Sequence, residues 1–332
     1  MLRRAAVAAV FVATCFGASR GAADDQMPSW KDGAAKKAIV SLVSRVTTPG
    51  PDLLPPPARI AVFDNDGTLW AEQPMYFQLM FSIERIKALA PAHPEWKQQE
   101  PFASLLRGDV AAAFASTPDP ELKIAMASQA GLTIPEFEQS VREWFASARH
   151  PTTGRLLSEM VYQPMLEVLR YLRANGFRTY IVSGGGIEFM RVFAEQLYGI
   201  PPEQVVGSTN RLQFEMRGGK PAIVNAGEIA FTDDKGGKPV GIYLAIGRHP
   251  ILAFGNSDGD LAMLQYTCDG AAPELCVYIH HTDAAREWAY DRTSKIGRLD
   301  KGLDEAKTRR WTVVDMKSDW KTVFGPRHDK AD

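Results

Sequence analysis

The chain has 332 residues, of which 45% are hydrophobic, 10% aromatic and 23% charged. This composition is ordinary for a globular protein and excludes disordered, collagen-like and coiled-coil chains, while the length favours two domains or one domain with a substantial insert. The formal net charge is −1, from 38 basic and 39 acidic residues. A nucleic-acid-binding protein needs a basic surplus to contact phosphates, so nucleic acid is not an expected partner.

Residues 1–23 have the pattern of a secretory signal peptide. Arg3 and Arg4 precede an apolar run over residues 5–16, and small residues at 21–23 offer a cleavage site. The run is too short to span a bilayer, which takes about 20 residues. A disordered Ala-rich tail and a lipoprotein anchored through Cys15 are the weaker alternatives. We therefore expect a periplasmic or secreted protein without stable membrane insertion.

The first third of the chain predicts a helix, a connector and a buried strand. Residues 30–46 have the spacing of an amphipathic helix, and five prolines in residues 49–57 exclude a regular element there. Residues 59–63 are apolar and end abruptly in Asp64-Asn65-Asp66-Gly67-Thr68. Residues 76–159 then show mostly helical periods broken by prolines, which predicts a helical insert of domain size.

From residue 163 helices and strands alternate. A helix is expected over 164–172 and a strand over 177–182, followed by Ser183-Gly184-Gly185-Gly186 and a helix that stops at Gly199. Three more apolar runs predict buried strands, at residues 251–254, 275–279 and 311–314. Apolar strands separated by helices indicate a mainly parallel sheet covered on both faces, whose ligands bind beyond the carboxyl ends of the strands.

Polar clusters follow three of these strands. Asp64 and Asp66 are spaced so that both carboxylates can face one site, where a hard divalent ion such as Mg²⁺ would relieve their repulsion. The Ser183–Gly186 run can present backbone amides and a hydroxyl to an anion, for which phosphate is the natural ligand. The run Gly255-Asn256-Ser257-Asp258-Gly259-Asp260 adds oxygen ligands at the same edge. Each cluster taken alone is also compatible with a simple turn or a capped helix.

Lys238 is the candidate for a basic residue that balances the carboxylates and binds phosphate at this edge. It opens a predicted helix, where a lysine opposes the helix dipole, so that its charge makes more sense facing carboxylates or phosphate. Lys235 and Lys220 are the competing candidates, and a solvated surface lysine is the plain reading of each.

Taken in order, the four clusters resemble the motifs of the haloacid-dehalogenase-like (HAD) superfamily. The run Val182-Ser183-Gly184-Gly185 and the helical insert look most like the phosphoserine-phosphatase-like branch with a helical cap. The resemblance implies an α/β fold with a Rossmann-like core, a mainly parallel sheet and an inserted helical cap domain. It implies divisions at residues 1–23 (signal peptide), 24–75 (helix, connector and first part of the core), 76–159 (cap) and 160–326 (remainder of the core).

The same resemblance implies a mechanism and roles for the site residues. Asp64 would attack phosphorus to form an aspartyl-phosphate, and Asp66 would be the general acid and base. Lys238 and Ser183, with the amides of Gly184 and Gly185, would hold the transferring phosphoryl oxygens. Glu72 is a candidate substrate contact. Mg²⁺ is the implied cofactor, and its ligands would be Asp64, Asp66, Asn256 and Asp260.

Two departures from the branch's pattern affect the metal and phosphate contacts. Asn256 stands where the branch carries an aspartate ligand of the metal, and Gly259 stands where it carries an asparagine. Asp258 or Asp260 is expected to take over, directly or through water. The pair His280-His281 ends a predicted strand, and a structural histidine is the preferred interpretation.

These observations predict an exported, Mg²⁺-dependent phosphomonoester hydrolase acting on small-molecule phosphate esters. The alternatives are a phosphotransferase on the same scaffold and a catalytically impaired member that binds phosphate esters. A dehalogenase is disfavoured, since members acting on carbon–halogen bonds typically lack the second aspartate that Asp66 provides. No oligomeric state is predicted. Cys268 and Cys276 could form a disulfide or remain two buried thiols.

Overall fold

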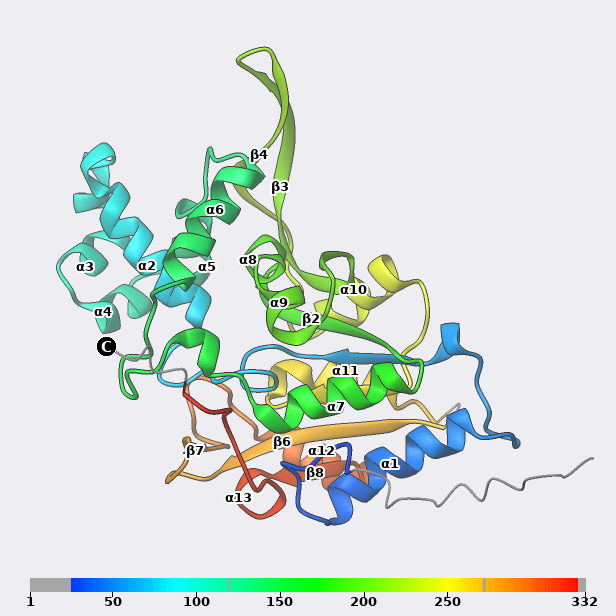
Figure 1. Ribbon diagram of the computed structural model, residues 1–332. Helices are drawn as coiled ribbons and strands as arrows, with labels where there is room; N and C mark the ends of the chain where they lie inside the picture. The colour runs from blue at the N-terminus through cyan, green and yellow to red at the C-terminus, as the bar shows by residue number, and fades with distance from the viewer. Residues whose placement is uncertain (1–24, 119, 271–272, 328–332) are drawn as a thin grey trace, which may run out of the picture.

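The computed structural model describes residues 25–118, 120–270 and 273–327 (Figure 1). The predicted signal peptide therefore lies outside the described residues. The helices are α1 (Ala34–Thr47), α2 (Phe77–Leu89), α3 (Phe102–Leu106), α4 (Val110–Ala115), α5 (Pro120–Ala127), α6 (Ile134–Phe145), α7 (Gln163–Ala174), α8 (Ile187–Arg191), α9 (Ala194–Tyr198), α10 (Gly237–Ile246), α11 (Leu261–Thr267), α12 (Lys301–Arg309) and α13 (Met316–Asp319). The strands are β1 (Ile60–Phe63), β2 (Arg178–Gly186), β3 (Val205–Arg217), β4 (Lys220–Phe231), β5 (Leu252–Gly255), β6 (Leu275–Thr282), β7 (Ala289–Tyr290) and β8 (Thr312–Asp315).

One mainly parallel sheet forms the core of the described chain. Its strand order is β4-β3-β2-β1-β5-β6-β7, and β8 also pairs with β6. Strands β3, β2, β1, β5, β6 and β8 are joined by parallel pairings, whereas β4 and β7 are antiparallel to their neighbours. The register places Phe63, the last residue of β1, beside Ile181 of β2 and Phe254 of β5. The carboxyl ends of these three strands therefore meet at one edge.

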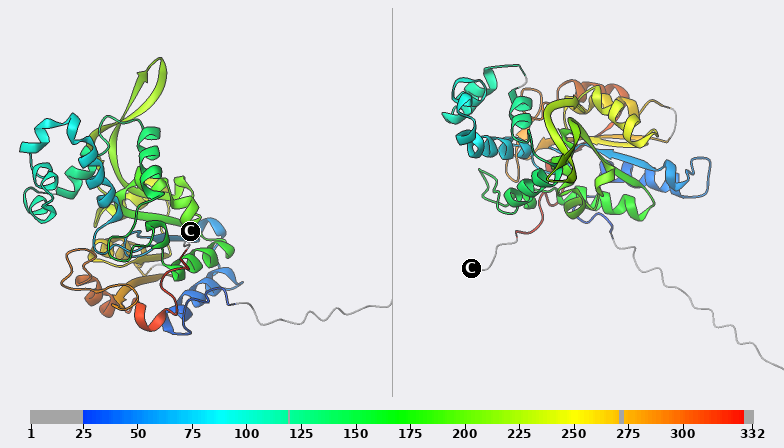
Figure 2. Two further views of the ribbon diagram at one scale, coloured as in Figure 1. Left: turned by 60° about the vertical axis from the view of Figure 1, so that its left-hand side comes forward. Right: turned by 90° about the horizontal axis from the view of Figure 1, so that it is seen from above.

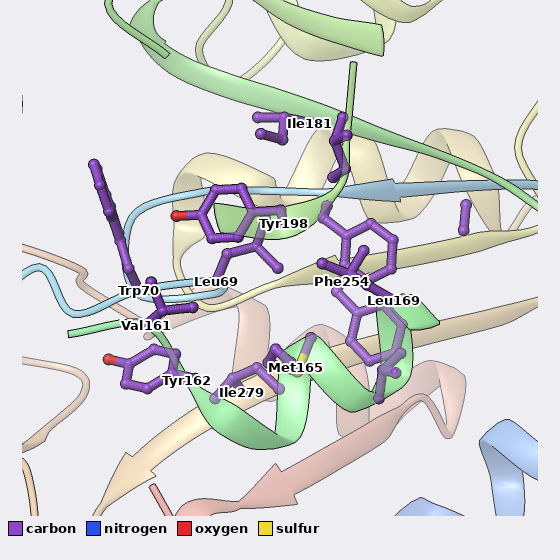
Figure 3. Packing of buried hydrophobic residues seen from close by; sticks show 14 of the residues in the cluster. Leu69, Trp70, Val161, Tyr162, Met165, Leu169, Ile181, Tyr198, Phe254 and Ile279 are labelled. Carbon is purple, nitrogen blue, oxygen red and sulfur yellow. The ribbon is translucent and has the colours of Figure 1, made fainter. Parts of the chain in front are cut away.

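The sheet is buried on both faces, as the apolar strands predict. In β1, Ala61 and Phe63 belong to one hydrophobic cluster, and Ile60 and Val62 belong to another. Helices α1 and α7 pack in the first cluster, part of which Figure 3 shows around Phe254. Helices α10 and α11 contribute to the second cluster. Successive side chains of a strand point to opposite faces, so each strand must be apolar throughout when both faces are covered.

Helices α2 to α6 form the insert between β1 and β2. Helices α2 to α5, with the segment between α2 and α3, share a small core of their own, which includes Ile83, Trp96, Leu105 and Ile124. Helix α6 instead buries Phe137 in the main cluster beside α8. Folding as a helical cap agrees with the expectation from the sequence, and the boundaries at residues 76 and 159 stay a prediction.

The ribbon formed by β3 and β4 is the largest element that the sequence interpretation missed. The two strands run antiparallel from Thr209↔Phe231 to Arg217↔Lys220 and turn at Gly218-Gly219, both of which have positive φ. Figure 2 shows this ribbon projecting from the core beside the cap helices. Residues 212–216 alternate between apolar and polar before a two-glycine turn, which is a sequence pattern typical of a hairpin. The interpretation looked instead for continuously apolar, buried strands, and the outer part of this ribbon exposes its apolar residues.

Three smaller features differ from, or complete, the expectations. Strand β2 continues through the glycine run to Gly186, and the following helix is split into α8 and α9. Cys268 and Cys276 form a disulfide between the end of α11 and the start of β6, which decides the alternative that the sequence left open. Within the described ranges, no helix combines the length and apolar composition that crossing a bilayer requires.

Candidate active site

Asp64 lies at the centre of the sheet edge because it directly follows β1. Its backbone N–H donates to the carbonyl of Phe254 at 2.9 Å, which extends the β1–β5 pairing by one residue. The chain then turns sharply at Gly67, whose φ of 72° is left-handed. A side chain at Gly67 would collide with the carboxylate of Glu72 and the amide of Asn256. The Asp-Asn-Asp-Gly run thus needs its glycine for both the turn and the close approach of these groups.

Lys238 forms a buried ion triad with two aspartates. Its Nζ lies 2.7 Å from Oδ1 of Asp64 and 2.5 Å from Oδ1 of Asp260. The other carboxylate oxygen of Asp260 accepts the backbone N–H groups of Asn256 and Ser257 at 2.9 and 3.0 Å. Lys238 is the second residue of α10, so the helix carries it to the sheet edge. Asp260 is in a position to orient Lys238, while Asp64 lies at the cavity.

The buried carboxylates at this edge carry more negative charge than Lys238 balances. Burial, reinforced by the charge of Asp260, raises the pKa of Asp64, and Lys238 opposes this effect. Burial raises the pKa of Asp66 to about 6, although the indole of Trp70, 2.7 Å from Asp66 Oδ1, opposes the rise. Burial alone would lower the pKa of Lys238, but the charges of Asp260 and Asp64 raise it, so the lysine stays cationic.

The glycine run places Ser183 beside this triad and is tightly packed. The N–H of Gly185 donates to Oγ of Ser183 at 3.2 Å, and the N–H of Gly186 donates to Oε1 of Gln78 in α2 at 2.8 Å. Gln78 therefore joins the cap to the glycine run. Helix α8 has only five residues, so a helix dipole is not what this run offers an anion. The N–H groups of Gly185 and Gly186 are already bonded within the protein, contrary to the expected phosphate contact of Gly185, so the hydroxyl of Ser183 is the clearest donor of the run.

A cavity of about 370 Å³ opens above these groups. Asp64, Asp66, Ser183 and Lys238 line it together, which is the convergence that the sequence predicted. The remaining lining residues come from the segment after β1, the cap, the glycine run, the ribbon and the loops after β4 and β5: Glu72, Tyr76, Gln78, Leu79, Glu121, Leu122, Ala125, Met126, Gln129, Gly184, Gly185, Gly186, Ser208, Thr209, Asn210, Ile229, Thr232, Asp234, Ser257 and Gly259.

The two other predicted metal ligands, and the alternative Asp258, lie behind this lining. Asn256 accepts from Oγ1 of Thr68 at 3.2 Å and donates to Glu72. Asp260 uses both carboxylate oxygens within the protein, and Asp258 accepts the N–H groups of Asp300 and Gly302 at the start of α12, both at 2.9 Å. In the described ranges, no group of three or more His, Cys, Asp or Glu residues is arranged to hold a metal ion.

The donor chemistry nevertheless fits a hard divalent cation. Asp64 and Asp66 present carboxylates to the same cavity, and burial, with a smaller contribution from the charge of Asp260, raises the pKa of both. The amide oxygen of Asn256 is the nearby neutral oxygen donor that the sequence proposed. Oxygen ligands of these kinds are the ones that Mg²⁺ prefers.

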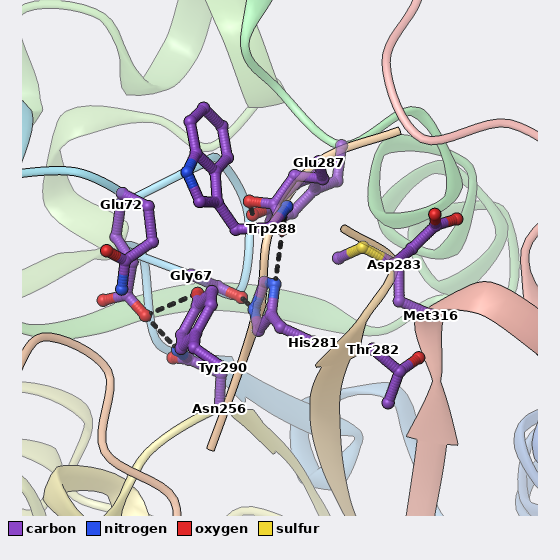
Figure 4. A network of polar contacts seen from close by, with 12 residues as sticks. Gly67, Glu72, Asn256, His281, Thr282, Asp283, Glu287, Trp288, Tyr290 and Met316 are labelled. Carbon is purple, nitrogen blue, oxygen red and sulfur yellow. Dashed lines mark hydrogen bonds and ion pairs between the residues drawn. The ribbon is translucent and has the colours of Figure 1, made fainter. Parts of the chain in front are cut away.

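A polar network buttresses the turn after β1 (Figure 4). Oε1 of Glu72 accepts from the amide of Asn256 at 2.6 Å and from the hydroxyl of Tyr290 at 2.8 Å. The ring of His281 lies 2.8 Å from the carbonyl of Gly67 and 3.0 Å from the carboxylate of Glu287. Burial raises the pKa of Glu72 well above its ordinary value, although the hydroxyl of Tyr290 opposes the rise.

His281 is thus a structural residue with both ring nitrogens partnered, as the sequence interpretation preferred. Glu72 lines the cavity, but one of its carboxylate oxygens accepts hydrogen bonds within this network. Among the lining residues that escaped the sequence analysis are three polar residues of the cap: Gln78, Glu121 and Gln129. They lie on helices or turns of the cap, where polar residues at helical spacing carry no motif, so only the packed cap brings them to the cavity.

Comparisons with known proteins identify the family of the chain and agree with its fold. The family model described as haloacid dehalogenase-like hydrolase matches residues 61–265. No curated protein matches the chain. Among solved structures, a conserved functionally unknown protein from Anaerococcus prevotii DSM 20548 aligns with a TM-score of 0.53 and 17% identity, over 84% of this chain and 91% of the other. This likeness shows a shared fold.

Two further solved structures align at lower TM-scores. A protein with unknown function from Bordetella pertussis Tohama I aligns with a TM-score of 0.48 and 15% identity, over 78% of this chain and 98% of the other. A probable phosphoserine phosphatase from Vibrio cholerae aligns with a TM-score of 0.36 and 16% identity, over 78% of this chain and 67% of the other. Since the family match spans more than half of the sequence and includes Asp64, Ser183 and Lys238, the chain belongs to the haloacid dehalogenase-like hydrolases.

Proposed function

We propose that this hydrolase is an exported, Mg²⁺-dependent phosphatase that cleaves small phosphate monoesters through an aspartyl-phosphate. The observation that carries the proposal is the meeting of Asp64, Asp66, Ser183 and Lys238 around one cavity at the carboxyl ends of the strands. A nucleophile, an acid–base group, a hydroxyl donor and a fixed cation are the parts that phosphoryl transfer requires.

In the first step Asp64 attacks phosphorus, so that an Asp64 oxygen–phosphorus bond forms as the ester oxygen–phosphorus bond breaks. Asp66 donates its proton to the leaving alkoxide, and burial raises its pKa to about 6, which makes the protonated form more accessible than for an exposed aspartate. In the second step Asp66 takes a proton from water, which attacks phosphorus and releases inorganic phosphate and Asp64. Lys238 and Ser183 hold the phosphoryl oxygens during both steps.

Asp64, Asp66 and Asn256 would hold the Mg²⁺ ion, which supplies positive charge that reduces the repulsion between a carboxylate and a phosphate dianion. Asp260 keeps Lys238 in place through its 2.5 Å contact. Cap helices α2 and α5 line part of the cavity and would help to exclude water from it. Export is supported by the pattern of residues 1–23 and by the Cys268–Cys276 disulfide, because disulfides persist in oxidising compartments.

Phosphate release from an aryl phosphate, measured with the mature chain in Mg²⁺ and in EDTA, tests the proposal. We expect Mg²⁺-dependent release that Asp64→Asn lowers by at least about a thousandfold, because an amide cannot replace the nucleophile. Asp304→Asn, at a side chain that is 71% exposed, is the matched control and should keep full activity. Retained turnover in a folded Asp64→Asn variant would contradict the nucleophile assignment, and transfer of phosphate to an added alcohol would identify a phosphotransferase.

A further inference from the structure

The lining of the cavity includes a row of three residues from the cap. Glu121, Ala125 and Gln129 follow one another at intervals of four residues along and just beyond α5, and all three line the cavity. Side chains at this spacing lie on one face of a helix. Ala125 leaves room between its neighbours, so the exposed Glu121 and the buried Gln129 flank an open strip.

Gln129 carries an acceptor that the protein leaves without a donor. The side chain is only 4% exposed, and its Oε1 has no hydrogen-bond partner in the described chain. A buried amide oxygen without a partner is costly, and Gln129 belongs to the cavity lining, so a small rotation of its side chain would offer this oxygen to an N–H or O–H group of a ligand.

Acidic residues outnumber basic residues in the lining of the cavity. Five acidic residues line it (Asp64, Asp66, Glu72, Glu121 and Asp234), and Lys238 is the one basic residue among the described lining. Lys238 is already paired with Asp64 and Asp260, and Asp234 is partly balanced by the exposed Lys235 at 3.4 Å. No arginine or histidine of the described chain lines the cavity to receive a carboxylate on the leaving group.

Apolar side chains occupy the wall around this strip. Leu79, Leu122, Met126 and Ile229 line the cavity from α2, α5 and β4. They suit a short hydrocarbon segment between the phosphate and a polar group at the far end.

We propose that the substrate is the phosphate monoester of an amino alcohol, whose protonated amine donates to Oε1 of Gln129 and faces the carboxylate of Glu121. The phosphate lies at Asp64 and Lys238, and the alkyl segment crosses the apolar wall. Leaving groups that carry a carboxylate are disfavoured, because that charge meets acidic neighbours and no free cation. This inference rests on the proposed function and narrows it to one class of ester.

Four esters that differ by one group at a time test the inference. Phosphoethanolamine carries the amine, phosphoserine adds a carboxylate, ethyl phosphate lacks the amine, and phosphocholine keeps the charge without an N–H donor. We expect kcat/KM for phosphoethanolamine to exceed the values for phosphoserine and ethyl phosphate by about tenfold or more, as a charged hydrogen bond provides. Phosphocholine should fall between phosphoethanolamine and ethyl phosphate.

Substitutions in the cap test whether Glu121 and Gln129 are the source of the preference for an amine-bearing ester. Glu121→Gln and Gln129→Leu should each reduce the ratio of kcat/KM for phosphoethanolamine to that for ethyl phosphate, and the effect should be largest in the double variant. Glu138→Gln on α6, outside the cavity lining, is the matched control and should leave the ratio unchanged. Equal or better turnover of phosphoserine, or a ratio that neither variant changes, would overturn the inference while the phosphatase proposal stands.

Binding to the Asp64→Asn variant, measured by calorimetry, separates the two proposals. Selective binding of phosphoethanolamine over phosphoserine by this variant, with no turnover of any ester by the wild-type protein, would support the ligand class and reject the phosphatase. Absence of both turnover and selective binding would reject both.

Discussion

Asn256 and Glu72 are 184 residues apart in the sequence, yet the amide Nδ2 of Asn256 donates to Oε1 of Glu72 at 2.6 Å. This contact places a buried carboxylate beside the position at which the phosphoserine-phosphatase-like branch carries an acidic metal ligand. The same Glu72 oxygen accepts from Tyr290, so the carboxylate is held by two donors. A neutral side chain at position 256 therefore avoids a pair of facing buried acids.

Asn256→Asp is expected to create that pair of acids. In EDTA the variant should lose about 3 kcal/mol of unfolding free energy, since a donor to Glu72 becomes an uncompensated buried charge. Added Mg²⁺ should restore stability, and half-maximal activity should need a lower Mg²⁺ concentration than in the wild-type protein. Urea unfolding with and without Mg²⁺ measures the first effect. The double variant with Glu72→Gln should recover metal-free stability, whereas an unchanged Mg²⁺ titration would show that Asn256 is not a ligand.

Lys238→Met should destabilise the fold as well as abolish activity. Removing the cation leaves Asp64 and Asp260 as unpaired buried groups, which costs about 3–5 kcal/mol near neutral pH. Lys235→Met is the control, because its side chain is 76% exposed and its pair with Asp234 is a weak surface contact. Equilibrium unfolding in urea gives both values. A Lys238→Met variant no less stable than the Lys235→Met control would be inconsistent with the buried triad.

Asp233 should make stability depend on pH. This carboxyl is fully buried and neither of its oxygens has a hydrogen-bond partner within the described chain. Burial raises its pKa from 3.8 to about 7, with Asp234 adding to the shift and Lys238 opposing it. Because the folded state holds the proton more tightly, the contribution to stability is complete below about pH 4 and is lost as the pH rises through about 7.

Asp233→Asn removes the group that titrates. The variant should gain up to about 4 kcal/mol relative to the wild-type protein between pH 4 and pH 8, in proportion to the pKa shift. Comparing the two proteins at each pH cancels any effect of the substitution that does not depend on pH. A stability difference that stays constant across this range would show that Asp233 ionises as it does in the unfolded chain.

Reduction of the Cys268–Cys276 disulfide should lower the unfolding free energy by about 2–3 kcal/mol. The two cysteines are eight residues apart, and closing such a short loop removes a limited amount of entropy from the unfolded chain. Urea unfolding with and without dithiothreitol measures the loss. The double variant Cys268→Ser, Cys276→Ser should be insensitive to the reductant. Equal wild-type stability in both conditions would show that the bond does not constrain the unfolded state.

The sequence by itself determined most of the parallel core strands and several of the residues that gather at their carboxyl ends. The apolar runs that end at Phe63 and Phe254, and the helices between them, indicate a parallel sheet because each strand must be apolar on both faces. In such a sheet, residues that follow neighbouring strands meet at one edge, so Asp64, Asp66 and Ser183 could be grouped before any contact was known. Lys238 joined them through its unfavourable place at a helix start and the family resemblance. These features depend on local pattern and a general rule of topology.

Only the tertiary structure decided which groups pair across that edge. No local sequence pattern shows that both carboxylate oxygens of Asp260 accept hydrogen bonds from Lys238 and backbone amides, or that Glu72 accepts one from Asn256. Nor does helical spacing reveal that the cap brings Gln129 to the cavity. A side chain's partner depends on how distant elements pack, and polar residues of a helix look alike in the sequence whether they face solvent or a ligand.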